Sequence, residues 1–240
     1  FMSASDTVHI RILGKGGHAA RPHLAVDPVL VAGSLVLALR DRRILPFLRM
    51  LGVAVVTWLA LNVPVMLAYP AGWGEFLRLN SERGYEWTTI YAIIGRELPF
   101  PDLPVPVLNV VSFGLFAAAC LGILFLGLRA QARPRAVELI FLIVVAFLLF
   151  NKVWSPQYSL WLVVPAVLAL PRWRLLLSWM LIDALVWPLL MWYMLGADNM
   201  GIPPELLDAA LLTRLFLLVV MAGLVVRQIW RREGELRLGA

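Results

Sequence analysis

Long blocks of apolar residues constrain this 240-residue chain more than any other feature of its sequence. The hydrocarbon core of a bilayer, about 30 Å thick, needs about 20 helical residues, within a range of about 17–25. Six blocks are candidate membrane spans, at 44–69, 104–128, 137–153, 156–170, 175–196 and 209–226. The third and fourth are the shortest. The sequence therefore predicts an all-α polytopic membrane protein with about six transmembrane helices.

Composition and charge favour a membrane protein over a soluble one. Hydrophobic residues make up 61% of the chain and charged residues 15%, whereas soluble domains have about 45–50% and about 25%. The net charge of +6 would suggest nucleic-acid binding in a soluble protein. Here the arginines flank the apolar blocks, which is typical of membrane topology signals. We expect a lipid bilayer as partner and no nucleic acid.

The arginine-rich segments predict which side of the membrane each loop faces. They lie at 40–49, 129–135, 172–174 and 227–232, whereas 197–208 has no Lys or Arg and 70–103 has more acids than bases. Six spans put every arginine-rich segment on one side, which the positive-inside rule makes cytoplasmic. We expect a multi-pass protein of the plasma (inner) membrane with both ends of the membrane part inside. The outer loop 70–103 contains a predicted interfacial helix at 74–83.

A polar patch, 151–158, separates the two shortest blocks. These blocks are either two short spans or one re-entrant pair, because irregular backbone at membrane depth needs protein or water to satisfy it. A lysine there needs a partner or water. The patch is either an ordinary turn or an outer-surface site for a lipid phosphate or sugar. The side chains that could bind such a ligand are a cation, a hydroxyl, an amide and a phenol: Lys152, Ser155, Gln157 and Tyr158.

Two opposite charges lie inside predicted spans, Asp183 in the fifth and Arg214 in the sixth. Counted from opposite ends at about 1.5 Å per residue, their depths differ by about 5 Å, which an arginine side chain can bridge. We expect an intramembrane ion pair that fixes two helices. A role in binding a donor phosphate is the alternative, because charges within membranes often serve function.

The first forty residues differ from the rest. Alternating apolar and polar residues predict a strand at 8–12, and the glycines at 14–17 predict a turn. Asp27-Pro28 predicts the start of a helix at 29–40. The motif G-x-G-G-H-x-x-x-P-H at 14–23, followed by Val26-Asp27-Pro28, resembles the lid (dimerisation) domain of zinc amidohydrolases and carboxypeptidases such as hippurate hydrolases and aminoacylases. This resemblance implies that His18 polarises a carbonyl in a neighbouring active site.

The rest of that family's zinc site is missing from the chain. It has three histidines, no H-x-D motif and no Glu-Glu pair. We therefore interpret residues 1–40 as an inactive fragment, predict no metal site, and treat 41–240 as a separate transmembrane domain.

The membrane part carries a second resemblance. The run N-K-V-W-S-P-Q-Y-S-L-W at 151–161 is followed by L-P-R-W-R at 170–174 and I-D-A-L-V-W at 182–187. Together with segments 76–84 and 224–229, this resembles the C-terminal half of glycosyltransferase family 87. These membrane proteins are similar to polyprenyl-phosphate-mannose-dependent α-mannosyltransferases with a GT-C fold.

This resemblance implies sugar transfer from a polyprenyl-phosphate donor, with mannose the expected sugar, to a lipid or glycan acceptor on the outer leaflet, without a cofactor. The family's catalytic acid belongs to an N-terminal half that this chain does not contain, so the catalytic residue is unknown and we expect an incomplete enzyme, inactive alone. The alternatives are a non-enzymatic scaffold or transporter-like subunit, and a peptidase assignment that follows the first forty residues.

Overall fold

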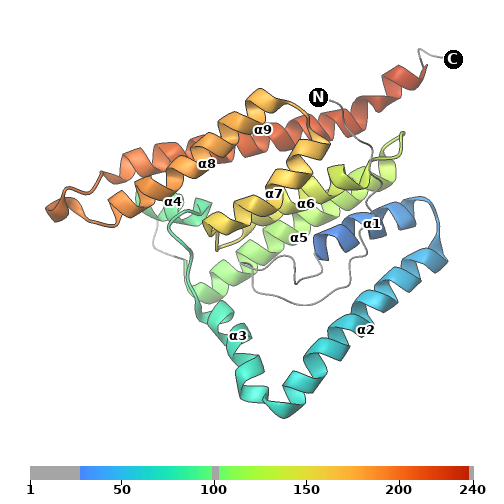
Figure 1. Cartoon of the computed structure of the whole chain (residues 1–240), viewed down its shortest axis with the longest axis horizontal. Helices are drawn as coiled ribbons and strands as arrows, with labels where there is room; N and C mark the ends of the chain where they lie inside the picture. The colour runs from blue at the N-terminus through green and yellow to red at the C-terminus, as the bar shows by residue number, and fades with distance from the viewer. Residues whose placement is uncertain (1–27, 99–102, 238–240) are drawn as a thin grey trace, which may run out of the picture.

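The computed structural model describes residues 28–98 and 103–237, and every regular element in these ranges is a helix (Figure 1). Four helices meet the length and apolarity required to cross a membrane, so the chain is a helical membrane protein. The helices are α1 (Pro28–Arg40), α2 (Ile44–Ala68), α3 (Pro70–Glu82), α4 (Ile90–Glu97), α5 (Val105–Arg129), α6 (Ala136–Phe150), α7 (Pro156–Ala169), α8 (Trp173–Tyr193), a single 3₁₀ turn (Ala197–Asn199) and α9 (Pro204–Arg237).

Helices α5 to α9 form the bundle, and α6 lies at its centre. Successive helices run in opposite directions along its length (Figure 1). Helix α6 packs against α1, α5, α7 and α9, and ten of its fifteen residues are buried. Because α6 is apolar on every face apart from Glu138 in its first turn, it is suited to a position enclosed by other helices.

The expected six spans are not supported by helix length. The four long apolar helices are α2, α5, α8 and α9. Helices α6 and α7 have 15 and 14 residues, which at 1.5 Å per residue is about 22 Å or less. The physical reason is that α6 ends at Phe150, three residues earlier than predicted. Asn151 and Ser155 have extended backbone, and α7 begins only at Pro156.

The N-terminal prediction is tested only in its helix. The predicted strand at 8–12 and the glycine turn lie outside the described residues. The predicted helix 29–40 corresponds to α1, which packs against α5 and α6. Arg40 at its C-terminus donates to the carbonyl oxygens of Gly127 at 2.7 Å and Gln131 at 3.2 Å. This part of the segment is thus packed into the helical bundle.

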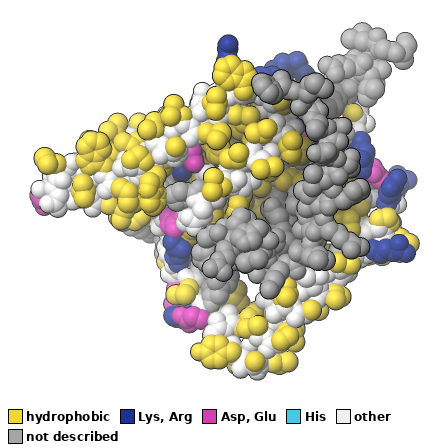
Figure 2. All heavy atoms as spheres, viewed as in Figure 1, with side chains coloured by type: hydrophobic (Ala, Val, Ile, Leu, Met, Phe, Trp, Pro, Cys, Tyr) yellow, Lys and Arg dark blue, Asp and Glu magenta, His cyan; other side chains and the backbone are white. Residues whose placement is uncertain are grey.

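Helices α2 and α3 form a V at one side of the bundle (Figure 1). Helix α2 has no buried residue, and it contacts α1 and α3. Asn62 joins the two arms, because its side-chain oxygen accepts from Trp73 Nε1 at 3.1 Å. Figure 2 shows hydrophobic side chains spread over α2, α7 and α8, as expected for surfaces that face lipid.

The two ends of the bundle differ in charge. At one end, Arg135 Nη2 donates to the Ala169 carbonyl at 3.0 Å, and Arg133 Nη2 lies 3.0 Å from Asp41 Oδ2. These contacts join the arginine-rich loops that the sequence placed on one side. At the other end lie residues 151–155 of the patch, the segment 83–89, which we call the outer segment, and the loop before α9. We call these the arginine-rich end and, after the side that the sequence predicts for 70–103, the outer end.

Candidate functional site

Lys152 lies at the outer end with its charge enclosed by protein. The residue is 7% exposed. Its Nζ donates to the carbonyl oxygens of Asn80 at 2.7 Å and Arg83 at 2.5 Å, and to Asn109 Oδ1 at 2.5 Å. An ammonium group has three donors, so these contacts use them all. Burial, and secondarily the charge of Arg83, lowers the pKa of Lys152. Lys152 therefore attaches the C-terminal end of α3 and the start of α5 to the patch.

The side chains of the other predicted patch residues point in different directions. Ser155 Oγ lies 3.4 Å from Glu86 Oε1, so it faces the outer segment as Lys152 does. Tyr158 stacks on Trp161, with ring centroids 4.7 Å apart, and lies 6.0 Å from the ring of Phe147. Gln157 is half-buried in the first turn of α7. The structure brings Lys152 and Ser155 to one segment and turns Tyr158 toward aromatic residues of α6 and α7.

Hydrogen bonds hold the outer segment against the patch along several residues. Glu86 N donates to the Lys152 carbonyl at 2.9 Å, and Thr88 Oγ1 donates to the Trp154 carbonyl at 2.6 Å. Tyr91 at the start of α4 donates to the Phe150 carbonyl at 2.9 Å. These bonds satisfy backbone groups that the irregular patch leaves free. They also fix the side chains of the outer segment over the end of α6.

A pocket of about 320 Å³ opens between these pieces, and we call it the outer pocket. Three parts of the chain line it: the segment 83–88, the pair Trp154 and Ser155, and α8 through Trp187 and Leu190. Two tryptophan side chains on its wall are half exposed, Trp87 at 51% and Trp187 at 49%. The wall thus combines aromatic faces with charged and hydroxyl groups. This combination is typical of pockets that orient a small ligand.

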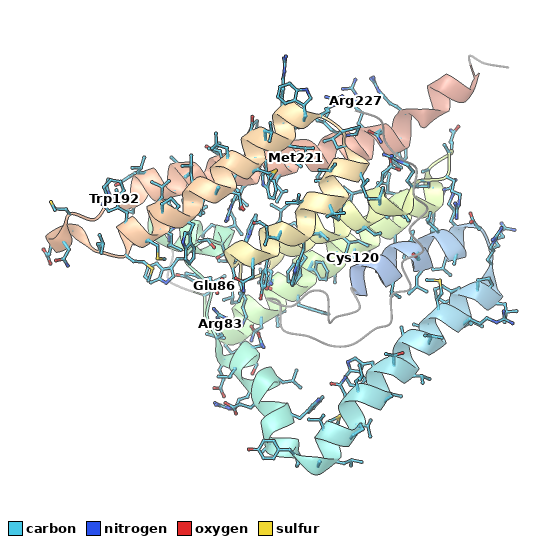
Figure 3. The ribbon with its side chains drawn as sticks, viewed as in Figure 1. Arg83, Glu86, Cys120, Trp192, Met221 and Arg227 are labelled. Carbon is cyan, nitrogen blue, oxygen red and sulfur yellow. The ribbon has the colours of Figure 1, made fainter. Side chains whose placement is uncertain are left out.

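Arg83 and Glu86 supply the charges of the outer pocket. They form a salt bridge, and their side chains are 49% and 20% exposed. Figure 3 shows them close together at the opposite end of the bundle from Arg227. An exposed guanidinium can bind a phosphate through two parallel hydrogen bonds. A carboxylate accepts hydrogen bonds from hydroxyl groups.

Behind the pocket, Asp183 and Arg214 are paired. Arg214 Nη1 lies 3.3 Å from Asp183 Oδ1, and Arg214 is 2% exposed. Arg214 Nη2 donates to the Thr88 carbonyl at 2.6 Å. Asp183 Oδ1 also accepts from Ser159 Oγ at 2.8 Å. The pair therefore joins α8, α9, α7 and the outer segment.

Trp154 lies between this ion pair and the outer pocket. Its ring lies under the Arg214 guanidinium, whose Cζ is 3.7 Å from the ring centroid. Its indole Nε1 donates to Ser159 Oγ at 3.1 Å. At 1% exposed, the side chain is held by contacts on every side. A cation over a desolvated tryptophan face contributes about 2 kcal/mol.

A second ion pair lies at the outer end, near the pocket. Arg96 Nε donates to Asp208 Oδ2 at 3.0 Å, which ties α4 to α9. Glu97 adds its carboxyl group to the same place. A hydrogen bond to Asp208, together with burial and the nearby carboxylates, raises the pKa of Glu97.

Several pocket residues were not singled out by the sequence. Arg83, Glu86 and Trp87 belong to a loop whose acids received no role, and Trp187 stood within the quoted I-D-A-L-V-W run without a role of its own. The available signal was the concentration of aromatic and charged residues at 83–88 in an outer loop. What the sequence could not give is the docking of this loop on the patch.

Among the described residues, no group of three or more His, Cys, Asp or Glu side chains is arranged to hold a metal ion. The chain matches no known protein family and no solved structure.

Proposed function

We propose that this chain is the C-terminal membrane part of a glycosyltransferase that uses a polyprenyl-phosphate sugar, with mannose as the expected sugar. The outer pocket receives the sugar and phosphate of the donor, and the acceptor is a lipid or glycan at the outer leaflet. The observation that carries the proposal is the composition of this pocket. It joins tryptophan faces, a carboxylate and an exposed arginine at one end of a membrane bundle.

The chemistry of each group matches a part of such a donor. The C–H face of a hexose packs on an aromatic ring, a role suited to Trp87 and Trp187. Glu86 can accept hydrogen bonds from hydroxyl groups, and the Ser155 hydroxyl can both accept and donate them. Arg83 provides the charge that a phosphodiester requires. Lys152, from the predicted patch, contributes through its hold on the Arg83 carbonyl.

We also propose that α6 and α7 cross the membrane as short helices, which gives six crossings. In support, the loop before α6 and the end of α7 meet at the arginine-rich end through Arg135 and Ala169. The loop between the two helices contacts the outer segment through Lys152. By the positive-inside rule the outer pocket then faces away from the cytoplasm, and the protein belongs to the plasma (inner) membrane.

Binding is the appropriate test, because we propose that the chain is incomplete as an enzyme. The purified chain in lipid nanodiscs is titrated with citronellyl phosphate mannose, a short-chain form of the proposed donor. Trp187→Ala should weaken binding about tenfold, equivalent to about 1.4 kcal/mol. The matched control is Trp173→Ala at the other end of α8, where the side chain is 63% exposed. This control should bind like the unmodified chain.

Two results would contradict the proposal. The first is absence of binding to the unmodified chain, which would favour a scaffold or a transporter-like subunit. The second is equal weakening by Trp187→Ala and Trp173→Ala, which would show that the donor associates with aromatic residues at the membrane surface in general. Citronellyl phosphate without the sugar separates the contribution of the sugar from that of the phosphate.

A further inference from the structure

We infer that Arg214 is a positioning residue that, together with Asp183, holds the walls of the outer pocket from behind. The identity of the pocket's ligand rests on the proposed function. The arrangement of the walls does not, since it follows from contacts within the chain.

The contacts of the pair reach all three parts of the chain that line the pocket. Arg214 Nη2 binds the carbonyl of Thr88 in the outer segment, and its guanidinium covers the ring of Trp154 in the patch. Asp183 lies on α8 four residues before Trp187, so the two share a helix face. One pair of side chains therefore sets the distance between three walls.

Trp154 is held by the same pair from a second direction. Its Nε1 donates to Ser159 Oγ, and that hydroxyl donates to Asp183 Oδ1. Arg214 fixes the face of the ring and Asp183, through Ser159, fixes its edge. Loss of the charges would release both restraints at once.

The energetics favour a positioning role over a purely stabilising one. Removing two charges from water is costly, and apolar replacements of buried ion pairs are often neutral or stabilising. In addition, Arg214 Nε is buried without a hydrogen-bond partner in the described part of the chain. The pair therefore contributes little net stability to the contact between α8 and α9. Its benefit lies in the geometry that it imposes on Thr88 and Trp154.

The test neutralises the pair without leaving one charge alone, with the double variant Asp183→Asn/Arg214→Met. The matched control is Glu138→Gln/Arg135→Met, which neutralises a pair at the arginine-rich end whose Glu138 is also buried. Both proteins carry fluorotryptophan, and the Trp154 signal in the fluorine NMR spectrum is assigned with Trp154→Phe. Melting temperature and binding of citronellyl phosphate mannose are measured on the same samples.

We expect the Trp154 signal to shift and broaden in the Asp183/Arg214 variant and to stay in place in the control. Binding of the probe should fall about tenfold in the first variant alone. Arg214→Lys gives a second test should the double variant yield little folded protein. Lysine keeps a charge beside Asp183 but lacks the planar fork that reaches Thr88 while covering Trp154, so the signal should shift again.

The outcomes separate this inference from the proposed function. An unchanged Trp154 signal in both Arg214 variants would overturn the positioning role, even with a lower melting temperature. A shifted signal with unchanged binding would support the hold on the pocket wall and would contradict the proposal that the probe binds in this pocket. If the unmodified chain binds no probe, the proposed function fails, and the NMR signal alone decides whether Arg214 positions the pocket walls.

Discussion

Lys152 and Arg214 are both buried cations, but they are satisfied in different ways. Asp183 and Arg214 were predicted to lie at similar depths, because helical rise converts residue number into height. The partners of Lys152 were not predictable in this way. Two of its three acceptors are backbone carbonyls at the end of α3, and a backbone carbonyl has no signature in the sequence. The location of the patch was thus readable, whereas its contacts depend on how the outer loop folds back.

At the level of single residues, we predict that Lys152→Met lowers the free energy of unfolding by about 1–3 kcal/mol, because buried acceptors lose their donor. Thermal unfolding in detergent measures the change. The control is Arg78→Met in α3, whose salt bridges with Glu75 and Glu82 are half exposed. Exposed pairs of this kind contribute little to stability, because solvent and salt screen them. Equal stability of the Lys152 variant and the unmodified chain would show that the ammonium does not hold α3.

Helix boundaries followed the apolar blocks closely, because a span must be both apolar and long. The predicted helix at 74–83 overlaps α3, which begins four residues earlier and ends one residue sooner, whereas α4 was not predicted. The sequence predicted that the third and fourth blocks are short, whereas the packing of α1 was missed. That packing depends on close contact between helices, which rests on single small residues. A Cβ atom at Gly127 would lie 2.5 Å from Val36 of α1.

The corresponding prediction concerns the contact between α1 and α5. Gly127→Val should separate these helices, because small residues let membrane helices approach closely. The melting temperature should fall, and Arg40 should lose its carbonyl acceptors at the end of α5. Gly114→Val is the control on the same helix, since a Cβ there meets nothing within 4 Å. Similar melting temperatures for the two variants would argue against tight packing of α1.

In the whole molecule, the two ends of the bundle differ in charge and in the contacts that hold them. The arginine-rich end joins loops through carbonyl groups and ion pairs, whereas the outer end contains the pocket and the Asp183–Arg214 pair. The arginine-rich loops predict an orientation, which stays a prediction. The pocket could not be predicted, because its three walls come from parts of the chain up to about a hundred residues apart in sequence.

The whole-molecule prediction is that Gln131 and Ser155 lie on opposite sides of the membrane. The chain has one cysteine, Cys120, so Cys120→Ser gives a background for single cysteines at 131, 155 and 198. A membrane-impermeant maleimide added outside intact cells should label positions 155 and 198 but not 131. Labelling of 198 alone would favour a re-entrant α6–α7 pair over two crossings.

The order of the residues along the chain gives two charged groups, Lys152 and Asp183, different histories during synthesis. All three acceptors of Lys152 precede it in the sequence, so they already exist when the ribosome adds the lysine. Asp183 is in the opposite situation, because Arg214 is made 31 residues later. A lone aspartate at the centre of a membrane helix costs about 2.5–3.5 kcal/mol on insertion scales. Helix α8 is therefore expected to wait in the translocation channel until α9 emerges, and the two should enter the bilayer together as a hairpin.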